Sequence, residues 1–245
     1  MSSRDRLYAE VKSEIEAFLF DGRVVAVFED MIRRSVPGYG AAIAMSGVIA
    51  ARYAQAGSNI YDLGCSLGAT SAAISQYIEA GSCAIIAVDN SQPMIDGCRE
   101  NLAALGDDAI RFVCDDIRDI EIANASVVVL NFTLQFIPLQ QRRALLQRIF
   151  LGMLPGGVLI LSEKLAFAQQ QQQLFTSLHH AFKQANGNSE LEISQKRTAL
   201  EEVLLAESMQ QHRRRLHSVG FDAVSCWFQC LNFASLLAFK AARVE

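Results

Sequence analysis

The sequence predicts an α/β protein built on a mostly parallel, seven-stranded sheet. Short apolar runs begin at residue 59 and alternate with helical stretches, and two further strand-like runs close the chain. Near-continuous apolar runs are typical of strands that are covered on both faces of a parallel sheet. The 245 residues are 51% hydrophobic and 20% charged, which is the composition of an ordinary globular protein.

Residues 8–53, which precede this alternation, are predicted to be helical. Apolar positions between residues 24 and 32 recur at helical spacing. Pro37 and Gly38 are expected to end that helix, and an Ala-rich helix is expected to follow over residues 39–53. We therefore predict a helical cap over residues 1–56 and a sheet domain over residues 57–245.

Within the sheet domain, five apolar segments are the first strand candidates. They are residues 59–63, 84–88, 110–113, 126–131 and 157–162. Amphipathic segments between most of them predict helices at residues 69–79, 92–105 and 139–153. A polar helical insert is expected at residues 165–220. The last two strands, 223–229 and 235–240, are close enough in sequence to form an antiparallel pair. This order predicts a Rossmann-like sheet with helices added at the N-terminus and after the fifth strand.

The turn after the first strand carries the sharpest functional signal. Its sequence, YDLGCSLG at residues 61–68, places Gly64 where a ligand can approach the backbone, ahead of the free N–H groups of a helix. A dinucleotide site would have G-x-G-x-x-G and a pyrophosphate here, whereas the carboxylate of Asp62 repels a pyrophosphate and attracts an ammonium group, directly or through water. S-adenosylmethionine (SAM) carries such a group, so Asp62, Gly64, Cys65 and Ser66 are predicted to bind SAM. The alternative is a tight turn with a capping acid.

Polar residues at the ends of the next strands extend this predicted site. Asp89 ends the second strand and can accept hydrogen bonds from both ribose hydroxyls. Asp116, or Asp115 in its place, follows the third strand and can accept the adenine amino group, with Ile117 beside the ring; a solvated turn is the alternative for this acidic pair. Asn131 ends the fourth strand and points to the same crevice, although a capping asparagine is the alternative.

Composition and spacing argue against several other classes of function. A net charge of −4 gives no general field for nucleic acid, so direct nucleic-acid binding is not expected. No apolar run reaches about 18 residues without a charge, so no membrane span is expected. The six cysteines form no C-x-x-C pair and the four histidines have no metal-site spacing, so no metal is predicted. Free thiols suggest a reducing, cytoplasmic setting.

Five segments together make the chain resemble the carboxy-S-adenosyl-L-methionine synthases, a branch of the class I methyltransferase superfamily. They are residues 20–39, 61–68, 130–136, 161–164 and 189–197. The resemblance implies the class I methyltransferase fold and a transferase that takes SAM and prephenate to carboxy-S-adenosyl-L-methionine (carboxy-SAM) and phenylpyruvate. The product would supply an enzyme that carboxymethylates a hydroxylated wobble uridine in tRNA. The alternatives are an ordinary methyltransferase acting on a small molecule or RNA, and a non-catalytic SAM-binding partner.

The resemblance also assigns individual residues and an oligomeric state. The family's cofactor-contact positions are occupied by Tyr39, Gly64, Asp89, Asn90, Asp116, Ile117 and Asn131. Arg197 matches the arginine expected to pair with the added carboxylate, and it is the catalytic candidate. Ser66 stands where the superfamily commonly has glycine. A homodimer is implied, in agreement with the apolar helices near the N-terminus.

Overall fold

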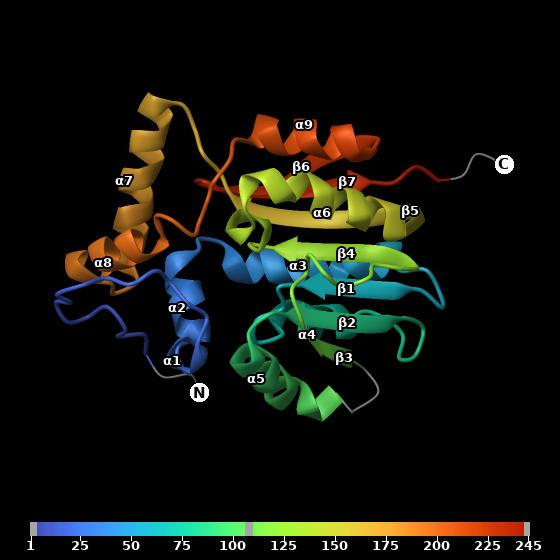
Figure 1. Ribbon diagram of the computed structural model, residues 1–245, viewed down its shortest axis with the longest axis horizontal. Helices are drawn as coiled ribbons and strands as arrows, with labels where there is room; N and C mark the ends of the chain where they lie inside the picture. Colours follow the sequence, from blue (N-terminus) through green and yellow to red (C-terminus); the bar gives the residue numbers. More distant parts are fainter. Residues whose placement is uncertain (1–3, 106–109, 243–245) are drawn as a thin grey trace.

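A single mixed sheet organises the protein (Figure 1). The computed structural model describes residues 4–105 and 110–242, and in these residues the sheet has seven strands in the order β3-β2-β1-β4-β5-β7-β6. The strands are β1 (Asn59–Leu63), β2 (Ala84–Asp89), β3 (Ile110–Cys114), β4 (Ala125–Asn131), β5 (Met153–Lys164), β6 (Ala223–Cys230) and β7 (Phe233–Phe239). Neighbours among β1 to β5 pair in parallel, and β7 pairs antiparallel with both β5 and β6. The predicted sheet and its antiparallel C-terminal pair are confirmed.

The fifth strand is the one whose predicted length was most in error. Residues 157–162 were expected, whereas β5 runs from Met153 to Lys164. Met153 pairs with Ala125 of β4, and Lys164 pairs with Phe233 of β7. Pairing with neighbours on both sides therefore extends the strand beyond the apolar run that marks it in the sequence.

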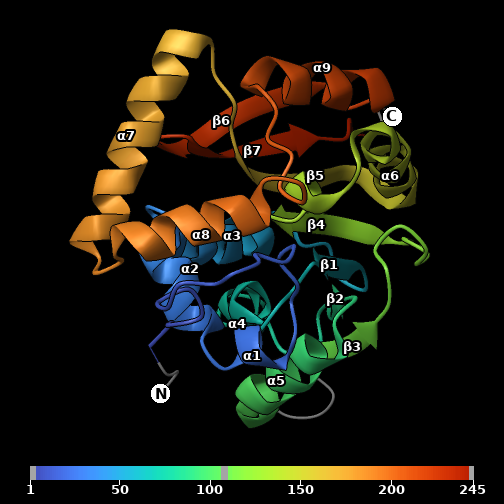
Figure 2. The ribbon, with the colours of Figure 1, turned by 60° about the vertical axis from the view of Figure 1, so that its left-hand side comes forward.

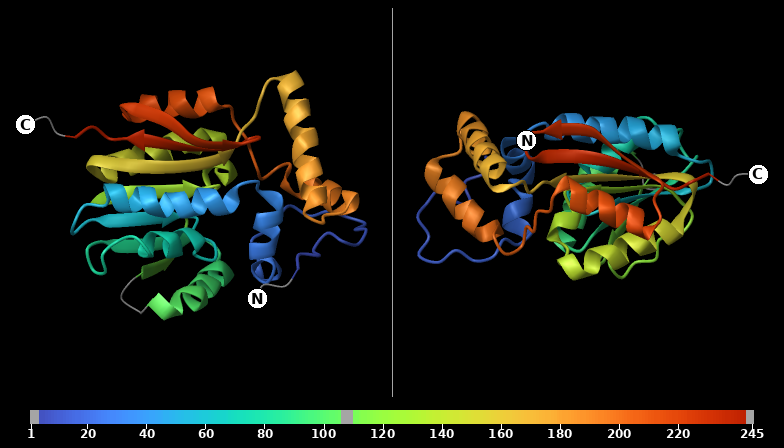
Figure 3. Two further views of the ribbon diagram at one scale, coloured as in Figure 1. Left: turned by 180° about the vertical axis from the view of Figure 1, so that it is seen from behind. Right: turned by 90° about the horizontal axis from the view of Figure 1, so that it is seen from above.

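Two helical layers cover the two faces of the sheet (Figure 3). One layer contains α3 (Tyr39–Tyr53), α4 (Ala69–Ser75), α5 (Gln92–Leu102) and η1 (Ala103–Leu105), and the other contains α6 (Leu139–Gly152) and α9 (Met209–Val219). Ile74 and Ile95 of the first layer pack on Ile60 and other buried strand residues. Ile149 and Leu216 of the second pack on the opposite face. The apolar faces of these helices therefore pack on the two faces of the sheet and form two apolar cores.

A further group of elements lies beyond the carboxyl ends of the parallel strands (Figures 1 and 2). We call it the end layer. It consists of residues 4–21, α1 (Gly22–Val25), α2 (Phe28–Ser35), α7 (Gln169–Ala185) and α8 (Glu190–Leu200). The predicted insert therefore divides: α7 and α8 join the end layer, whereas α9 returns to the sheet. A short helix, η2 (Leu134–Phe136), completes the elements near this end.

Residues 4–21, which we call the N-terminal strap, do not form the predicted helix. The helical prediction is correct for α1, α2 and α3 and wrong for residues 8–21. Residues 8–12 of the strap bond to α8: Lys12 N donates to Gln195 Oε1 at 2.8 Å, and Gln195 Nε2 donates to the carbonyls of Tyr8 and Glu10 at 3.0 and 2.8 Å. A buried glutamine on another element thus satisfies backbone groups that a helix would have satisfied internally. No helix in the described ranges is long and apolar enough to cross a membrane.

Candidate active site

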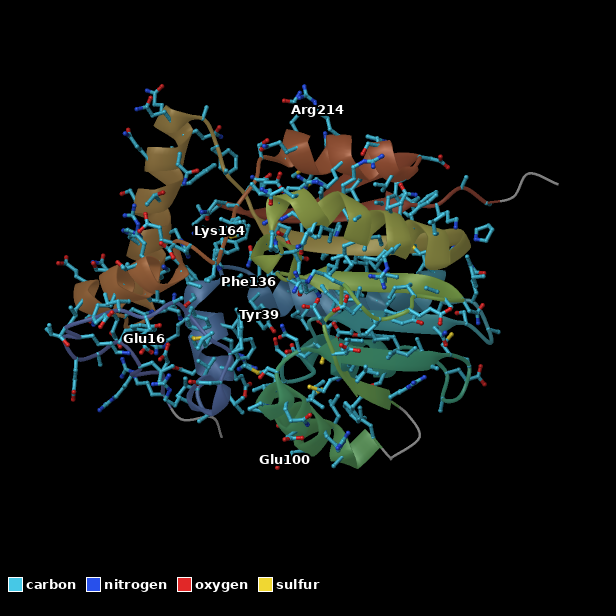
Figure 4. The ribbon with its side chains drawn as sticks, in the orientation of Figure 1. Glu16, Tyr39, Glu100, Phe136, Lys164 and Arg214 are labelled. Carbon is cyan, nitrogen blue, oxygen red and sulfur yellow. The ribbon has the colours of Figure 1, made fainter. Side chains whose placement is uncertain are left out.

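A cavity of about 810 Å³ opens where the sheet meets the end layer. Its walls include the ends of β2, β4 and β5, the loop after β1, and parts of α2, α7 and α8. Figure 4 places the labelled side chains of Tyr39, Phe136 and Lys164 at this junction, and all three line the cavity. Its position matches the ligand crevice of open α/β sheets, and its volume is typical of small-molecule sites.

The backbone of the loop after β1 is left-handed at two positions, Gly64 and Ser66. Gly64 has φ +80°, and a Cβ atom there would lie 2.4 Å from Thr133 Oγ1. The amides of Gly64 and Cys65 both donate to Val88 O, at 2.8 and 2.9 Å. Ser66 has φ +47°, a conformation that glycine adopts at lower cost. Gly64, Cys65 and Ser66 all line the cavity, so the loop backbone is open to a ligand where the sequence predicted it.

Asp89 lies where the loop and β2 meet. Its Oδ2 accepts from the amide of Ser66 and its Oδ1 from the amide of Ser91, each at 3.0 Å. The side chain is only 8% exposed, and burial raises its pKa. Each carboxylate oxygen keeps further acceptor capacity, and Asp89 lines the cavity together with Asn90. This geometry can accept hydroxyl donors.

Asp62 does not line the cavity. It is 1% exposed, and its Oδ2 accepts from Ser71 Oγ of α4 at 2.7 Å. Burial raises the pKa of Asp62 to about 6. The predicted direct contact with a ligand ammonium is therefore not supported by this position, because the carboxylate bonds to α4 behind the loop.

Asp116 and Ile117 line the cavity, and Asp115 does not. Both oxygens of Asp116 are bound by Arg118: Nε donates to Oδ1 at 2.8 Å and Nη2 to Oδ2 at 2.5 Å. This pair holds the pKa of Asp116 below its usual value. Asp115 is exposed and accepts from the amide of Asp116. Of the two acids that the sequence left open, Asp116 is the one at the cavity, and its charge is balanced by Arg118.

Asn131 also lines the cavity, and it joins four elements through its amide. Its Nδ2 donates to Ser46 Oγ at 3.3 Å and to Thr70 Oγ1 at 3.1 Å, and its Oδ1 accepts from Ser162 Oγ at 2.6 Å. Both amide hydrogens are thus used within the protein, and one lone pair of the oxygen stays free for a ligand donor. Tyr39 lines the same region, with its ring centroid 6.2 Å from that of Phe132.

Arg197 does not line the cavity of its own chain. It is exposed on α8 and borders a surface groove with residues of α7 such as Thr176 and His180. The preceding residue, Lys196, is buried and lines the cavity instead. Successive helical residues point about 100° apart, so the two side chains leave α8 in different directions. One chain alone therefore does not bring Arg197 to the cavity.

Several charged or polar residues at the cavity were not predicted as site residues. They are Arg33, Arg118, Lys164, His179, Lys183 and Lys196. Lys164 ends β5 in the same way that Asp89 ends β2, so the rule that found Asp89 could also have found Lys164. His179 and Lys183 come from α7, whose placement across the strand ends is not encoded by any local pattern. No group of three His, Cys, Asp or Glu side chains suited to a metal occurs in the described part of the chain.

Comparison with known proteins agrees with this geometry. Residues 60–157 match the methyltransferase domain family. Carboxy-S-adenosyl-L-methionine synthases from Trichlorobacter lovleyi and Geobacter metallireducens are 59% and 57% identical to the chain, over 96% of this chain and 98% of each relative. The corresponding synthase from Shewanella piezotolerans is 52% identical over 98% of this chain and 99% of its own length.

Solved structures with little sequence similarity share the fold. Human N-acetylserotonin methyltransferase in complex with SAM has a TM-score of 0.61 at 17% identity, with 90% of this chain and 56% of that chain covered. A putative S-adenosyl-L-methionine-dependent methyltransferase from Methanococcus maripaludis has a TM-score of 0.60 at 19% identity, with 96% and 99% covered. The predicted class I methyltransferase fold is confirmed. The cavity at the strand ends and the near full-length relatives together show that the chain belongs to the carboxy-S-adenosyl-L-methionine synthase family, transferases that use SAM and form carboxy-SAM.

Proposed function

We propose that this enzyme takes the carboxyl group from prephenate, converting SAM and prephenate to carboxy-SAM and phenylpyruvate. The observation that carries the proposal is the extent of the cavity, which reaches from the loop at Gly64 to α7 and α8 of the end layer. A site for SAM alone needs the loop and the strand ends. The part of the cavity that extends to α7 and α8 would give a second small molecule room beside SAM.

The SAM subsite in this proposal uses the predicted residues that line the cavity. They are Tyr39, Gly64, Cys65, Ser66, Asp89, Asn90, Asp116, Ile117 and Asn131. Asp89 would accept the ribose hydroxyls, Ile117 would flank the adenine, and Asp116 would meet its amino group. Asp62 would act indirectly, by holding α4 through Ser71.

The chemistry requires orientation and a dry site. The sulfonium of SAM acidifies its methyl protons, and prephenate gains aromaticity when it loses its ring carboxylate and its ring hydroxyl. The methyl proton leaves with that hydroxyl as water, and the new bond joins the methyl carbon to the released carbon dioxide. Phe20, Phe136 and Phe233 line the cavity, and their rings would exclude the water that would otherwise quench the reaction. No side chain is assigned as a base.

The role proposed for Arg197 depends on a second copy of the chain. Arg197 would pair with the new carboxylate through a charge-assisted hydrogen bond, but it lies outside the cavity of its own chain. A homodimer would allow one copy to present it to the other. Apolar side chains exposed on α3 and α7, including Met45 (43%) and Leu174 (56%), are suited to such an interface.

The place of the reaction in the cell follows from its product. Carboxy-SAM would supply a tRNA carboxymethyltransferase that acts on a hydroxylated wobble uridine, and this chain would not bind tRNA itself. We also propose that the protein works in the cytoplasm, where its six free cysteines would stay reduced.

Mass spectrometry of a reaction with prephenate labelled with ¹³C at the ring carboxylate tests the proposal. The expected result is a SAM derivative heavier by one labelled carbon dioxide, formed together with phenylpyruvate. Formation of S-adenosylhomocysteine with an added acceptor, and no labelled product, would identify an ordinary methyltransferase instead.

A further inference from the structure

The end of the cavity beneath the end layer is rich in lysine. The sequence has five lysines, and Lys164, Lys183 and Lys196 all line this cavity. They come from three different elements, β5, α7 and α8. Three ammonium groups gathered from separate elements repel one another, so this arrangement calls for a source of negative charge.

The carboxylates of the cavity do not supply that charge. Glu29 pairs with Arg33 at 2.8 Å, and Asp116 pairs with Arg118. Asp89 bonds to the amides at the end of β2. Each acid that lines the cavity is therefore already bound elsewhere.

Of the three lysines that line the cavity, only Lys196 has a carboxylate partner within the described residues. Its Nζ lies 3.6 Å from Asp5 Oδ2 and donates to Ser35 Oγ at 3.2 Å. Within residues 4–105 and 110–242, Nζ of Lys164 and Nζ of Lys183 have no ion pair and no hydrogen bond. The nearby His179 adds no charge of its own: its Nε2 donates to Ser35 O at 2.7 Å, and burial lowers its pKa to about 3, which leaves the ring neutral.

The two unpaired lysines are close enough to act on each other. Burial, and after it the cations of Lys164, Lys196 and Arg197, together lower the pKa of Lys183 to about 7. Partly buried ammonium groups without counterions are costly. A bound anion would remove that cost, and two ammonium groups on two elements match a ligand with two carboxylates.

We propose that Lys164 and Lys183 form the subsite for the second substrate, a small dicarboxylate, and bind its two carboxylate groups. This inference rests on the proposed function, since prephenate is such a dicarboxylate. The adjacent wall is apolar: the ring of Phe233 lies 5.1 Å from His179 and 6.1 Å from Phe132. The subsite therefore pairs two cations with an apolar surface for a six-membered ring.

Calorimetry with a stable probe tests the subsite apart from the reaction. Benzylsuccinate has a ring and two carboxylates, and 3-phenylpropionate is the matched monocarboxylate. With S-adenosylhomocysteine present, Lys164→Met and Lys183→Met are each expected to weaken benzylsuccinate binding about tenfold or more, with a smaller effect on 3-phenylpropionate. Lys183→Arg should retain most of the affinity. Lys12→Met, at an exposed position of the strap, should change nothing.

Two results would overturn the subsite. One is a loss of S-adenosylhomocysteine affinity in Lys164→Met and Lys183→Met that is as large as their loss of benzylsuccinate affinity. That result would assign the lysines to the carboxylate in the amino-acid portion of S-adenosylhomocysteine. The other is benzylsuccinate binding that is absent from the unmodified protein or independent of both lysines. If benzylsuccinate binding depends on the lysines but prephenate gives no carboxylated product, the prephenate reaction fails and the dicarboxylate subsite stands.

Discussion

The amide of Ser66 donates a hydrogen bond to Oδ2 of Asp89 at 3.0 Å. This contact joins the loop after β1 to the end of β2, so one carboxylate both fixes the loop and faces the cavity. Since the two strands are neighbours in parallel register, with Leu63 opposite Val88, the contact is a direct product of the sheet.

Asp89→Asn is expected to weaken SAM binding about tenfold to a hundredfold. The amide loses the charge-assisted acceptance of ribose hydroxyls, and its NH₂ group can face the Ser66 amide, donor against donor. Titration calorimetry measures the loss. Asp96→Asn, at an exposed position on α5, is the control, and equal affinity of both variants would contradict the proposed ribose contact.

Ser66→Val is expected to lower the free energy of unfolding by about 1–2 kcal/mol, because a β-branched residue is strained at φ +47°. Ser66→Gly should keep both stability and SAM affinity. Urea denaturation measures the free energy of unfolding of the two variants. Unchanged stability of the valine variant would show that the left-handed backbone at this position is not a constraint.

Arg142→Met is expected to destabilise the protein by about 3–5 kcal/mol. Arg142 is fully buried and donates to the carbonyls of Gln135, Ile137 and Leu205, at 3.0, 2.8 and 2.7 Å, while pairing with Glu207 at 2.5 Å. Its loss would leave the carbonyls of Ile137 and Leu205 without this donor, whereas Gln135 O keeps the amide of Leu205 and Glu207 keeps Arg215.

Because Gln135 lines the cavity, Arg142→Met should also raise the KM for the second substrate. The matched control is Arg143→Met, at an exposed position of the same helix. A stability loss below about 1 kcal/mol for Arg142→Met, as for an ordinary surface substitution, would mean that the buried arginine is not needed to hold η2.

Binding of a dicarboxylate should take up protons at pH 8 and not at pH 6. Lys183, with its pKa lowered to about 7 by burial and by Lys164, Lys196 and Arg197, is largely neutral at pH 8 in the empty cavity. A bound anion raises that pKa and recharges the amine, whereas at pH 6 the amine is already charged. Calorimetry of benzylsuccinate in buffers of different ionisation enthalpy measures the uptake. Persistence of the full uptake in Lys183→Met would assign it to another group.

If Arg197 acts across a homodimer, two variants impaired at different residues should complement each other at a SAM concentration too low to saturate Asp89→Asn. Mixing Arg197→Ala with Asp89→Asn after subunit exchange would give roughly a quarter of the original activity, because half of the dimers would each contain one intact site. Sedimentation velocity checks that dimers form. Activity no greater than that of the separate variants would restrict Arg197 to its own chain or to no role.

The sequence predicted those parts of the fold that depend on local pattern. Both ends of β1 were predicted correctly, because its apolar run ends where the loop at Gly64 begins, and the amides of that loop donate to Val88 O. Residues 8–21 were predicted wrongly, since their backbone partners are on Gln195 and other groups of α8. Local periodicity contains no information about such distant partners.

The site residues also divide into those that a local sequence pattern predicts and those that depend on distant contacts. Asp89, Asp116 and Asn131 were found because parallel strands end at one edge of a sheet. Arg197 and Lys196 are adjacent in sequence, and only the orientation of α8 decides which faces the cavity. That orientation depends on tertiary packing, including Ala199 against the strap at Phe18.

The position of β7 also limits how early the sheet can be completed while the chain is being synthesised. β7 supplies the partners of β5 from Val158 to Lys164, and Phe233 lies opposite Lys164. Until the ribosome has released β7, β5 is an unprotected edge that can pair with another chain. A message truncated ahead of codon 233 should therefore yield an aggregating and inactive product, even though it encodes the complete SAM loop.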